Sequence, residues 1–252
     1  MQSASATHPD IYLGIMTGTS LDAIDVAACR FSLDSMRKRP ESEHAEVEVI
    51  EFSSSPWPKP MREILMTLAT ATDVSMDLLA RTHFALAEYY ANAVRDCLAS
   101  AKLTYKDIRA IGLHGQTIRH LPHPTAIAEI PDIRATFQLG SGSALAARSQ
   151  IDVVSDFRSA DVALGGQGAP LVPMFDYAFL RSKTTNRLIV NIGGISNVTW
   201  IPHSAAHQDV LAFDCGPGNM LMDAVTRKYF GEPFDRKGDR ARSGIIDKAL
   251  LA

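Results

Sequence analysis

Apolar and polar residues follow two different spacings along this chain, and together they predict strands and helices. Short runs rich in apolar and β-branched residues predict strands, whereas apolar residues three or four apart predict helices. The predicted strands cover residues 11–16, 23–29, 46–52, 108–113, 136–139, 151–157, 188–192, 198–201 and 210–213. The predicted helices cover residues 61–71, 75–102, 143–148 and 220–230, with a further helical pattern from residue 243 and a Ser/Pro connector over residues 53–60. We expect Ser75 to be the N-cap of the second helix, His83 to belong to its buried stripe, and Gly231 to end the helix over residues 220–230.

Two strand–turn–strand units indicate how the chain is organised. The first joins residues 11–16 to 23–29, and the second joins residues 188–192 to 198–201, each through a short turn rich in Gly and Ser. Such a unit predicts a hairpin. The Gly-rich residues 164–170 lie between the two units and indicate a flexible connection. We predict an α/β protein with one domain over residues 1–158 and the start of a second over residues 159–252.

Composition and charge narrow the class of protein. The 252 residues include 25 Lys and Arg against 28 Asp and Glu, which gives a formal net charge of −3, and 46% are hydrophobic. These values are typical of a globular protein and argue against nucleic-acid binding. No apolar run reaches the length of about 18 residues that a membrane helix needs. With three cysteines in no metal-binding spacing and no secretory signal, we expect a soluble, reduced, cytoplasmic protein.

Familiar nucleotide-binding motifs are absent, but two Gly-containing turns have the right chemistry for phosphate. No Walker-type sequence occurs, and the two G-x-G sequences lack the third glycine of a dinucleotide-binding fingerprint. In the turn from Gly18 to Asp22, backbone N–H groups and hydroxyls could bind phosphate oxygens, while Asp22 or Asp25 could hold Mg²⁺ through water. The alternative is a hairpin turn with only internal hydrogen bonds. The turn over residues 193–197 could likewise bind phosphate or be a hairpin turn with only internal hydrogen bonds.

Three further groups of polar residues lie near predicted strand ends. Asp214 precedes a Gly-Pro-Gly turn and a helix, so it could be a general base, a metal ligand or an ordinary N-cap. Residues 114–117 offer hydrogen-bonding groups suited to sugar hydroxyls, although His114 could equally be a buried, satisfied side chain. Arg158, with Asp156 and Asp161, could form an anion site or a solvated ion-pair network.

Five segments in order closely resemble the anhydro-N-acetylmuramic acid kinase family. The resemblance runs from about Tyr12 to Ala252, nearly the whole chain. The segments are Gly18-Thr19-Ser20-Leu21-Asp22, His114-Gly115-Gln116-Thr117, Gly165-Gly166-Gln167-Gly168-Ala169-Pro170-Leu171, Asn191-Ile192-Gly193-Gly194-Ile195-Ser196-Asn197 and Phe213-Asp214-Cys215-Gly216-Pro217-Gly218-Asn219.

The resemblance implies an actin-like fold with two α/β domains, the second incomplete here, and a nucleotide between them. It also implies the reaction of the family. Water opens the internal ring of 1,6-anhydro-N-acetylmuramic acid, and ATP with Mg²⁺ phosphorylates O6 to give N-acetylmuramic acid 6-phosphate. The family works in cell-wall recycling in the bacterial cytoplasm, usually as a homodimer.

The resemblance also assigns residues. The family's catalytic base matches Asp214, and its second Gly-rich turn matches Gly193 and Gly194. By position, Gln116, Thr117 and Arg158 are candidate sugar contacts, and Asp22 is the candidate metal ligand. The ATP-binding stretch matches Gly18, Thr19, Ser20, Leu21, Asp22, Ala23, Ile24 and Asp25.

Two departures from the family pattern affect these expectations. Ala23 stands where the family usually has Gly, which costs about 1 kcal/mol only if that position needs a positive φ. The chain also looks cut short, because family members continue for roughly another hundred residues and a second domain of normal size needs them. Two alternatives therefore stay open: an inactive fragment that binds sugar or a partner, and a kinase of the same fold for another amino sugar.

Overall fold

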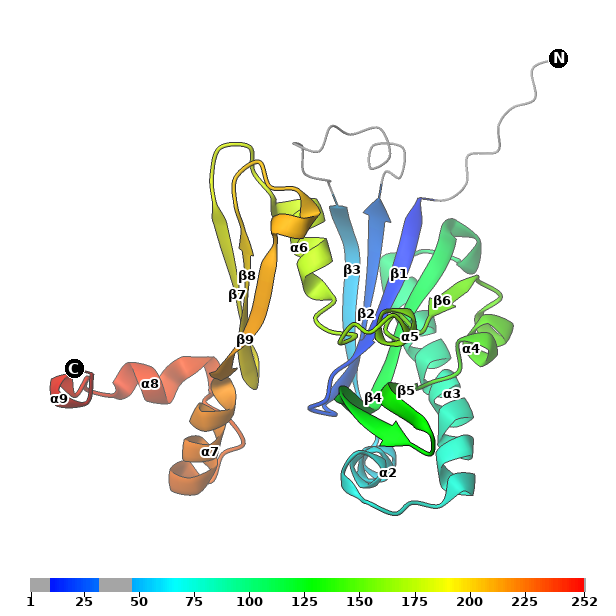
Figure 1. The fold of residues 1–252 in the computed structure, drawn as a ribbon, viewed down its shortest axis with the longest axis horizontal. Coiled ribbons are helices and arrows are strands. Elements are labelled where there is room, and N and C mark those ends of the chain that lie inside the picture. Colours follow the sequence, from blue (N-terminus) through cyan, green and yellow to red (C-terminus); the bar gives the residue numbers. More distant parts are fainter. Residues whose placement is uncertain (1–9, 32–46, 252) are drawn as a thin grey trace. The chain divides into compact units, whose positions relative to one another are not determined.

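The computed structural model describes residues 10–31 and 47–251, and these form two compact units (Figure 1). The described chain divides between Leu171 and Val172 rather than between Arg158 and Ser159. Residues 159–171 stay with the first unit because α5 (Ser159–Ala163) packs against a strand of that unit, β5. That the two units are two actin-like domains stays a prediction.

A mixed sheet forms the centre of the first unit. Its order is β3-β2-β1-β4-β5, and β6 pairs with β4. Strands β1, β2 and β3 pair antiparallel, whereas β4 pairs parallel with both β1 and β6. This mixed sheet, with the helices that follow its strands, confirms the α/β class. The strands are β1 (Ile11–Thr17), β2 (Ala23–Phe31), β3 (Val47–Pro56), β4 (Ile108–Ile127), β5 (Ile130–Leu139) and β6 (Val153–Ser155).

Two long helices bury the apolar face of this sheet. Helix α2 (Lys59–Thr70) and helix α3 (Met76–Ala101) place apolar residues at helical spacing, and α3 packs on β2 and β3. As predicted, Ser75 is the N-cap of α3, and its side chain accepts a hydrogen bond from the N–H of Leu78. Each fully buried Leu contributes about 1.5–3 kcal/mol. A short helix, α4 (Gly142–Ser149), packs against α3 and β6.

The second unit is an antiparallel three-stranded sheet with helices. Strands β7 (Arg187–Ile192), β8 (Ile195–Ile201) and β9 (Leu211–Pro217) pair in chain order, which confirms the hairpin predicted there. The predicted stop at Gly231 is confirmed, because this residue caps its helix with φ 70°. The helices are α6 (Val172–Leu180), α7 (Asn219–Phe230), α8 (Asp239–Ser243) and α9 (Lys248–Leu251).

The structure corrects three predicted elements. Residues 53–56, expected as a connector, extend β3, because an edge strand tolerates the Ser run and its final Pro. Residues 114–117, expected at a strand end, lie inside β4, which continues into a long hairpin with β5. The helical pattern after residue 243 gives no continuous helix, because α8 ends at Ser243 and Ile245 is 98% exposed, with nothing to pack against.

Over residues 10–31 and 47–251, none of the helices is both long enough and apolar enough to cross a membrane.

Candidate active site

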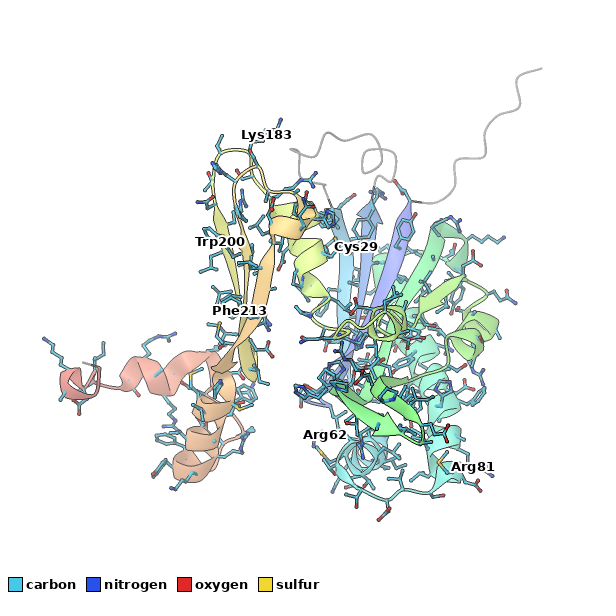
Figure 2. The ribbon with its side chains drawn as sticks, viewed as in Figure 1. Cys29, Arg62, Arg81, Lys183, Trp200 and Phe213 are labelled. Atoms are coloured by element: carbon cyan, nitrogen blue, oxygen red, sulfur yellow. The ribbon has the colours of Figure 1, made fainter. Side chains whose placement is uncertain are left out.

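The turn between β1 and β2 is held from its inner side by hydrogen bonds to its carbonyl oxygens. The oxygen of Gly18 accepts from the N–H of Leu21 and from Nε2 of Gln116, both at 3.2 Å. The oxygen of Leu21 accepts from Nε of Arg62 at 3.0 Å, and Arg62 comes from α2 (Figure 2). The oxygen of Asp22 accepts from the N–H of Trp57 at 3.3 Å.

Fixing the carbonyl of Gly18 also fixes the N–H of Thr19, because both belong to one peptide. In a planar trans peptide the C=O and the following N–H point in opposite directions, so an inward oxygen leaves an outward N–H. The side chain of Leu21 is buried, which anchors the turn in the core, whereas Thr19 and Ser20 are exposed. Within the described residues, the backbone N–H groups of Thr19 and Ser20 have no hydrogen-bond partner. Such a set of outward N–H groups binds anions.

The other residues of the predicted ATP-binding stretch differ in exposure and in hydrogen-bond partners. Asp22 is exposed, with its carboxylate 3.9 Å from Nη2 of Arg62, whereas Asp25 accepts a 2.6 Å hydrogen bond from Ser54. Ile24 belongs to the buried core. Ala23 begins β2 and is not among the residues with positive φ, so the missing Gly costs no backbone strain.

The described residues contain no group of three or more His, Cys, Asp or Glu side chains that could hold a metal. Mg²⁺ in kinase sites needs only one or two carboxylates, because substrate phosphates and water complete its shell. The exposed carboxylate of Asp22, next to the outward N–H groups, fits that requirement. Asp25 fits it less well, because Ser54 already occupies one of its oxygens.

His114 and Arg158 form a pair joined through defined nitrogens. Nδ1 of His114 lies 2.7 Å from the carbonyl oxygen of Gly115, so Nδ1 carries the proton and Nε2 is free to accept. Nε and Nη2 of Arg158 donate to that Nε2 at 3.0 and 2.8 Å. Burial, with the charge of Arg158, lowers the pKa of His114 and keeps the imidazole neutral. The side chain of His114 is half-buried rather than fully buried, and its two hydrogen bonds with Arg158 orient the guanidinium.

A second contact pins the other end of Arg158. Its Nη1 donates to the carbonyl oxygen of Gly168 at 2.5 Å, and the N–H of Gly168 donates to Asp161 at 2.7 Å. Asp156 instead accepts from Ser159. Within the described residues, Arg158 forms no ion pair with Asp156 or Asp161, so the expected ion-pair network is wrong. Two of the five N–H groups of the guanidinium remain available for an anion.

The other two predicted sugar contacts lie in different surroundings. The side chain of Gln116 is completely buried and contacts the turn at Gly18. Thr117 is half-buried, and its hydroxyl accepts a hydrogen bond from Gln138. The contact of Gln116 with sugar stays a prediction that its burial does not support.

A cavity of about 430 Å³ opens beside His114 in the first unit. Burial lowers the pKa of His83, whose Nδ1 accepts from the N–H of Gly140. The wall is rich in hydroxyl, amide and imidazole groups, which suit a polar, uncharged ligand. The lining residues are His83, Leu113, His114, Thr136, Phe137, Gln138, Gly140, Ser141, Gly142, Ser143, Ser155, Asp156 and Ser159.

In the second unit the Gly193-Gly194 turn packs against the beginning of α7. The N–H groups of Gly218 and Asn219 donate to the carbonyl oxygens of Gly194 and Gly193, both at 2.8 Å. A Cβ at Gly218 would lie 2.3 Å from the oxygen of Gly193, so only glycine allows this approach. The N–H of Gly193 donates to the carbonyl oxygen of Ile195 at 3.3 Å, whereas the N–H of Gly194 has no hydrogen-bond partner within the described residues and is available to an anion.

Asp214 lies on the exposed surface within β9, where it pairs with Asn197 of β8. Its carboxylate has no hydrogen-bond or ion-pair partner within the described residues. The N-cap of α7 is Gly218, so the alternative of an N-capping Asp214 is wrong. An exposed carboxylate without a partner is free to act as a base or ligand.

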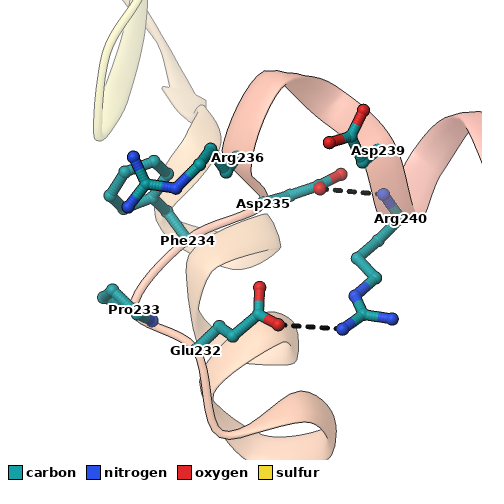
Figure 3. A pocket seen from close by; sticks show the side chains of 7 residues that line it. All are labelled: Glu232, Pro233, Phe234, Asp235, Arg236, Asp239 and Arg240. Atoms are coloured by element: carbon teal, nitrogen blue, oxygen red, sulfur yellow. Dashed lines mark hydrogen bonds and ion pairs between the residues drawn. The ribbon is translucent and has the colours of Figure 1, made fainter.

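A second cavity, of about 410 Å³, lies in the loop after α7 (Figure 3). Its charges are paired within the loop itself. Arg240 contacts Glu232 at 2.8 Å, and Asp235 accepts from the N–H groups of Arg240 and Ala241. These contacts explain the loop's conformation and leave little free charge for a ligand.

Sequence reasoning missed Arg62, His83 and Gln138. Arg62 lies on an ordinary amphipathic helix, so no local pattern singles it out. His83 belongs to the predicted buried stripe of the long helix. Gln138 lies within a short predicted strand, where no local pattern marks it. Only the packing of helices α2 and α3 and the pairing of strand β5 bring these side chains to the site.

A protein-family model described as anhydro-N-acetylmuramic acid kinase matches residues 10–252. Three relatives carry the same name. That of Chromobacterium violaceum is 40% identical over 243 residues, which are 96% of this chain and 60% of the relative. That of Salinibacter ruber is 41% identical over 242 residues (95% and 58%), and that of Bacillus cereus is 37% identical over 238 residues (94% and 59%). The chain spans about three fifths of the length of the curated relatives it matches.

Proposed function

Since the chain belongs to the anhydro-N-acetylmuramic acid kinase family, we propose that it forms part of an ATP-dependent kinase acting on 1,6-anhydro-N-acetylmuramic acid. Water adds to the anomeric carbon, the bond from that carbon to O6 breaks, and O6 takes the γ-phosphoryl group of ATP. The products are N-acetylmuramic acid 6-phosphate and ADP. The observation that carries the ATP part is the turn from Gly18 to Asp22, in which the carbonyl oxygens of Gly18, Leu21 and Asp22 are hydrogen-bonded within the protein and the N–H groups of Thr19 and Ser20 are not.

The phosphate contacts follow from the two glycine turns. Phosphoryl transfer passes through a loose transition state whose charge is stabilised by backbone donors and Mg²⁺. The N–H groups of Thr19 and Ser20 supply such donors, and the turn at Gly193 and Gly194 supplies a further one from the N–H of Gly194. Asp22 would hold Mg²⁺, which would neutralise phosphate charge.

Asp214 is the proposed general base. Its carboxylate takes a proton from the attacking water, which makes the water a stronger nucleophile toward the anomeric carbon. The exposure of Asp214, without a partner that would consume its lone pairs, supports this role.

Arg158 and Thr117 are the proposed sugar contacts. A muramic acid carries a lactyl carboxylate, and the guanidinium of Arg158 has two N–H groups left for an anion. The cavity beside His114 supplies neutral polar groups for the hydroxyl and acetamido groups. A homodimer and a cytoplasmic location, both implied by the family resemblance, stay predictions.

The direct test uses the enzyme extended to the length of its relatives. Asp214→Asn keeps the shape of the side chain and removes its basicity, so we expect sugar-dependent ADP formation to fall by roughly 10²–10⁴. Asp239→Asn, an exposed acid of the same unit, is the matched control and should keep full activity. Equal activity of Asp214→Asn and the wild type would contradict the proposed base.

Two alternatives remain. A binding fragment predicts saturable sugar binding to the 252-residue chain without product, with or without ATP. A kinase for an open-ring amino sugar predicts turnover of N-acetylglucosamine or N-acetylmuramic acid in preference to the anhydro sugar. A substrate panel with both chain lengths separates these from the proposed function.

A further inference from the structure

Gln116 reaches the first phosphate turn because β4 carries one extra residue opposite β1. Ile15 pairs with Leu113, but Thr17 pairs with Gln116, so the register shifts between them. Gly115, the extra residue, has φ 76°, and its carbonyl oxygen accepts a 3.1 Å hydrogen bond from the hydroxyl of Thr17. A bulge of this kind re-aims the side chain that follows it.

The amide of Gln116 is oriented by its partners. Nε2 donates to the carbonyl oxygens of Gly18 at 3.2 Å and Thr117 at 3.4 Å. Carbonyl oxygens only accept, so the nitrogen must face them and the oxygen must face away. The side chain has no exposed surface, and its Oε1 has no hydrogen-bond partner within the described residues. Buried polar atoms are rarely left unpaired, so such an atom points to a requirement other than stability.

We propose that Gln116 is a positioning residue for ATP: it fixes the peptide between Gly18 and Thr19 so that the Thr19 N–H faces the phosphates. The inference rests on the proposed function. The carbonyl of Gly18 and the N–H of Thr19 belong to one planar peptide, so holding the oxygen inward holds the N–H outward. Without the amide, only the N–H of Leu21 holds the oxygen of Gly18, so the peptide is held less firmly and the donor is less well oriented.

This role differs from that of Arg62. Arg62 holds the carbonyl of Leu21 and therefore orients the peptide between Leu21 and Asp22, further along the turn. The strand that carries Gln116 also carries Thr117, a proposed sugar contact. Gln116 therefore connects the strand at the sugar to the turn at the nucleotide.

The test is a comparison of Michaelis constants in the enzyme of family length. Gln116→Met keeps the length of the side chain and removes the amide. We expect the KM for ATP to rise about tenfold, the effect of losing one well-placed hydrogen bond, while the KM for the anhydro sugar stays unchanged. Ser149→Ala removes a buried hydroxyl that donates to Leu145 at 2.8 Å, far along the chain from the turn. This control should lower thermal stability without changing either KM.

The outcomes separate the two proposals. An active wild type and a folded Gln116→Met with an unchanged KM for ATP would overturn the role of Gln116 alone. A rise in the sugar KM alone would also overturn it, in favour of a sugar contact. A wild type that neither binds nor turns over ATP would overturn the proposed function and this inference with it. If Gln116→Met does not fold, Gln116→Glu keeps the shape and replaces the donor by an acceptor, and the same selective rise in the ATP KM is expected.

Discussion

Replacing Gly115 by Ala tests the bulge that directs Gln116. The residue has φ 76°, in the left-handed region, where an L-residue costs about 1–2 kcal/mol. A Cβ would also lie 2.7 Å from the carbonyl oxygen of Leu139 and 3.3 Å from Cβ of Gln138. Both atoms belong to the paired strand β5, so relief requires moving the β4–β5 hairpin. We expect a total loss of about 2–4 kcal/mol in the free energy of unfolding.

The matched control is Gly14→Ala on the neighbouring strand. A Cβ at Gly14 meets no atom within 4 Å, and its φ is not positive. Since Gly in a strand costs roughly 0.5–1 kcal/mol relative to Ala, this variant should be unchanged or slightly more stable.

Tryptophan fluorescence reports the first unit if Trp200 is replaced by Phe in every variant, because Trp57 is then the only tryptophan and is buried there. We expect Gly115→Ala to lower the Tm by about 4–16 °C, since each kcal/mol shifts Tm by about 2–4 °C at this size. A loss below about 1 kcal/mol for Gly115→Ala, or an equal loss for Gly14→Ala, would refute the reasoning.

Three further predictions concern other contacts. Arg158→Lys removes the planar guanidinium, which contacts His114 and has N–H groups left for an anion, so we expect the KM for the muramic substrate to rise about tenfold. The KM for a sugar without the lactyl carboxylate should not rise, and steady-state kinetics on both sugars check this. Burial lowers the pKa values of His83 and His114 from their usual 6.5, so the unfolded chain binds more protons below that pH. Stability should therefore fall as the pH drops from 7 toward 5, and a flat profile in urea denaturation would contradict it. Arg62→Met frees the carbonyl of Leu21, so the KM for ATP should rise about tenfold without a change in the sugar KM.

Local pattern predicted most elements of the first unit. The hairpin at residues 11–29 and the cap at Ser75 were readable because turn residues and apolar spacing act over a few positions. The length of β4 was not, because residues 118–127 include Pro122 and Pro124, which argue against a strand, and they become a strand by pairing with β5. The pattern after residue 243 failed for a related reason: apolar spacing gives a helix only where a core buries it.

The candidate site also has some features that the sequence predicts and others that only the fold reveals. The sequence identified the turn at Gly18 and the pair of glycines at residue 193, because small residues at a turn have a direct chemical meaning. It did not show that Gln116 turns inward, since this depends on the bulge at Gly115 and on the distant turn at Gly18. Nor could it show that His114 orients Arg158, because these side chains are 44 residues apart along the chain.

The central claim is ring opening by water coupled to phosphate transfer. The most direct measurement incubates the enzyme of family length with ATP, Mg²⁺ and 1,6-anhydro-N-acetylmuramic acid in ¹⁸O-labelled water and analyses the product by mass spectrometry. We predict N-acetylmuramic acid 6-phosphate with one ¹⁸O at the anomeric hydroxyl and none in the phosphate, and a matching amount of ADP. ADP formation that does not depend on the sugar, or a phosphorylated product without the label, would contradict the account.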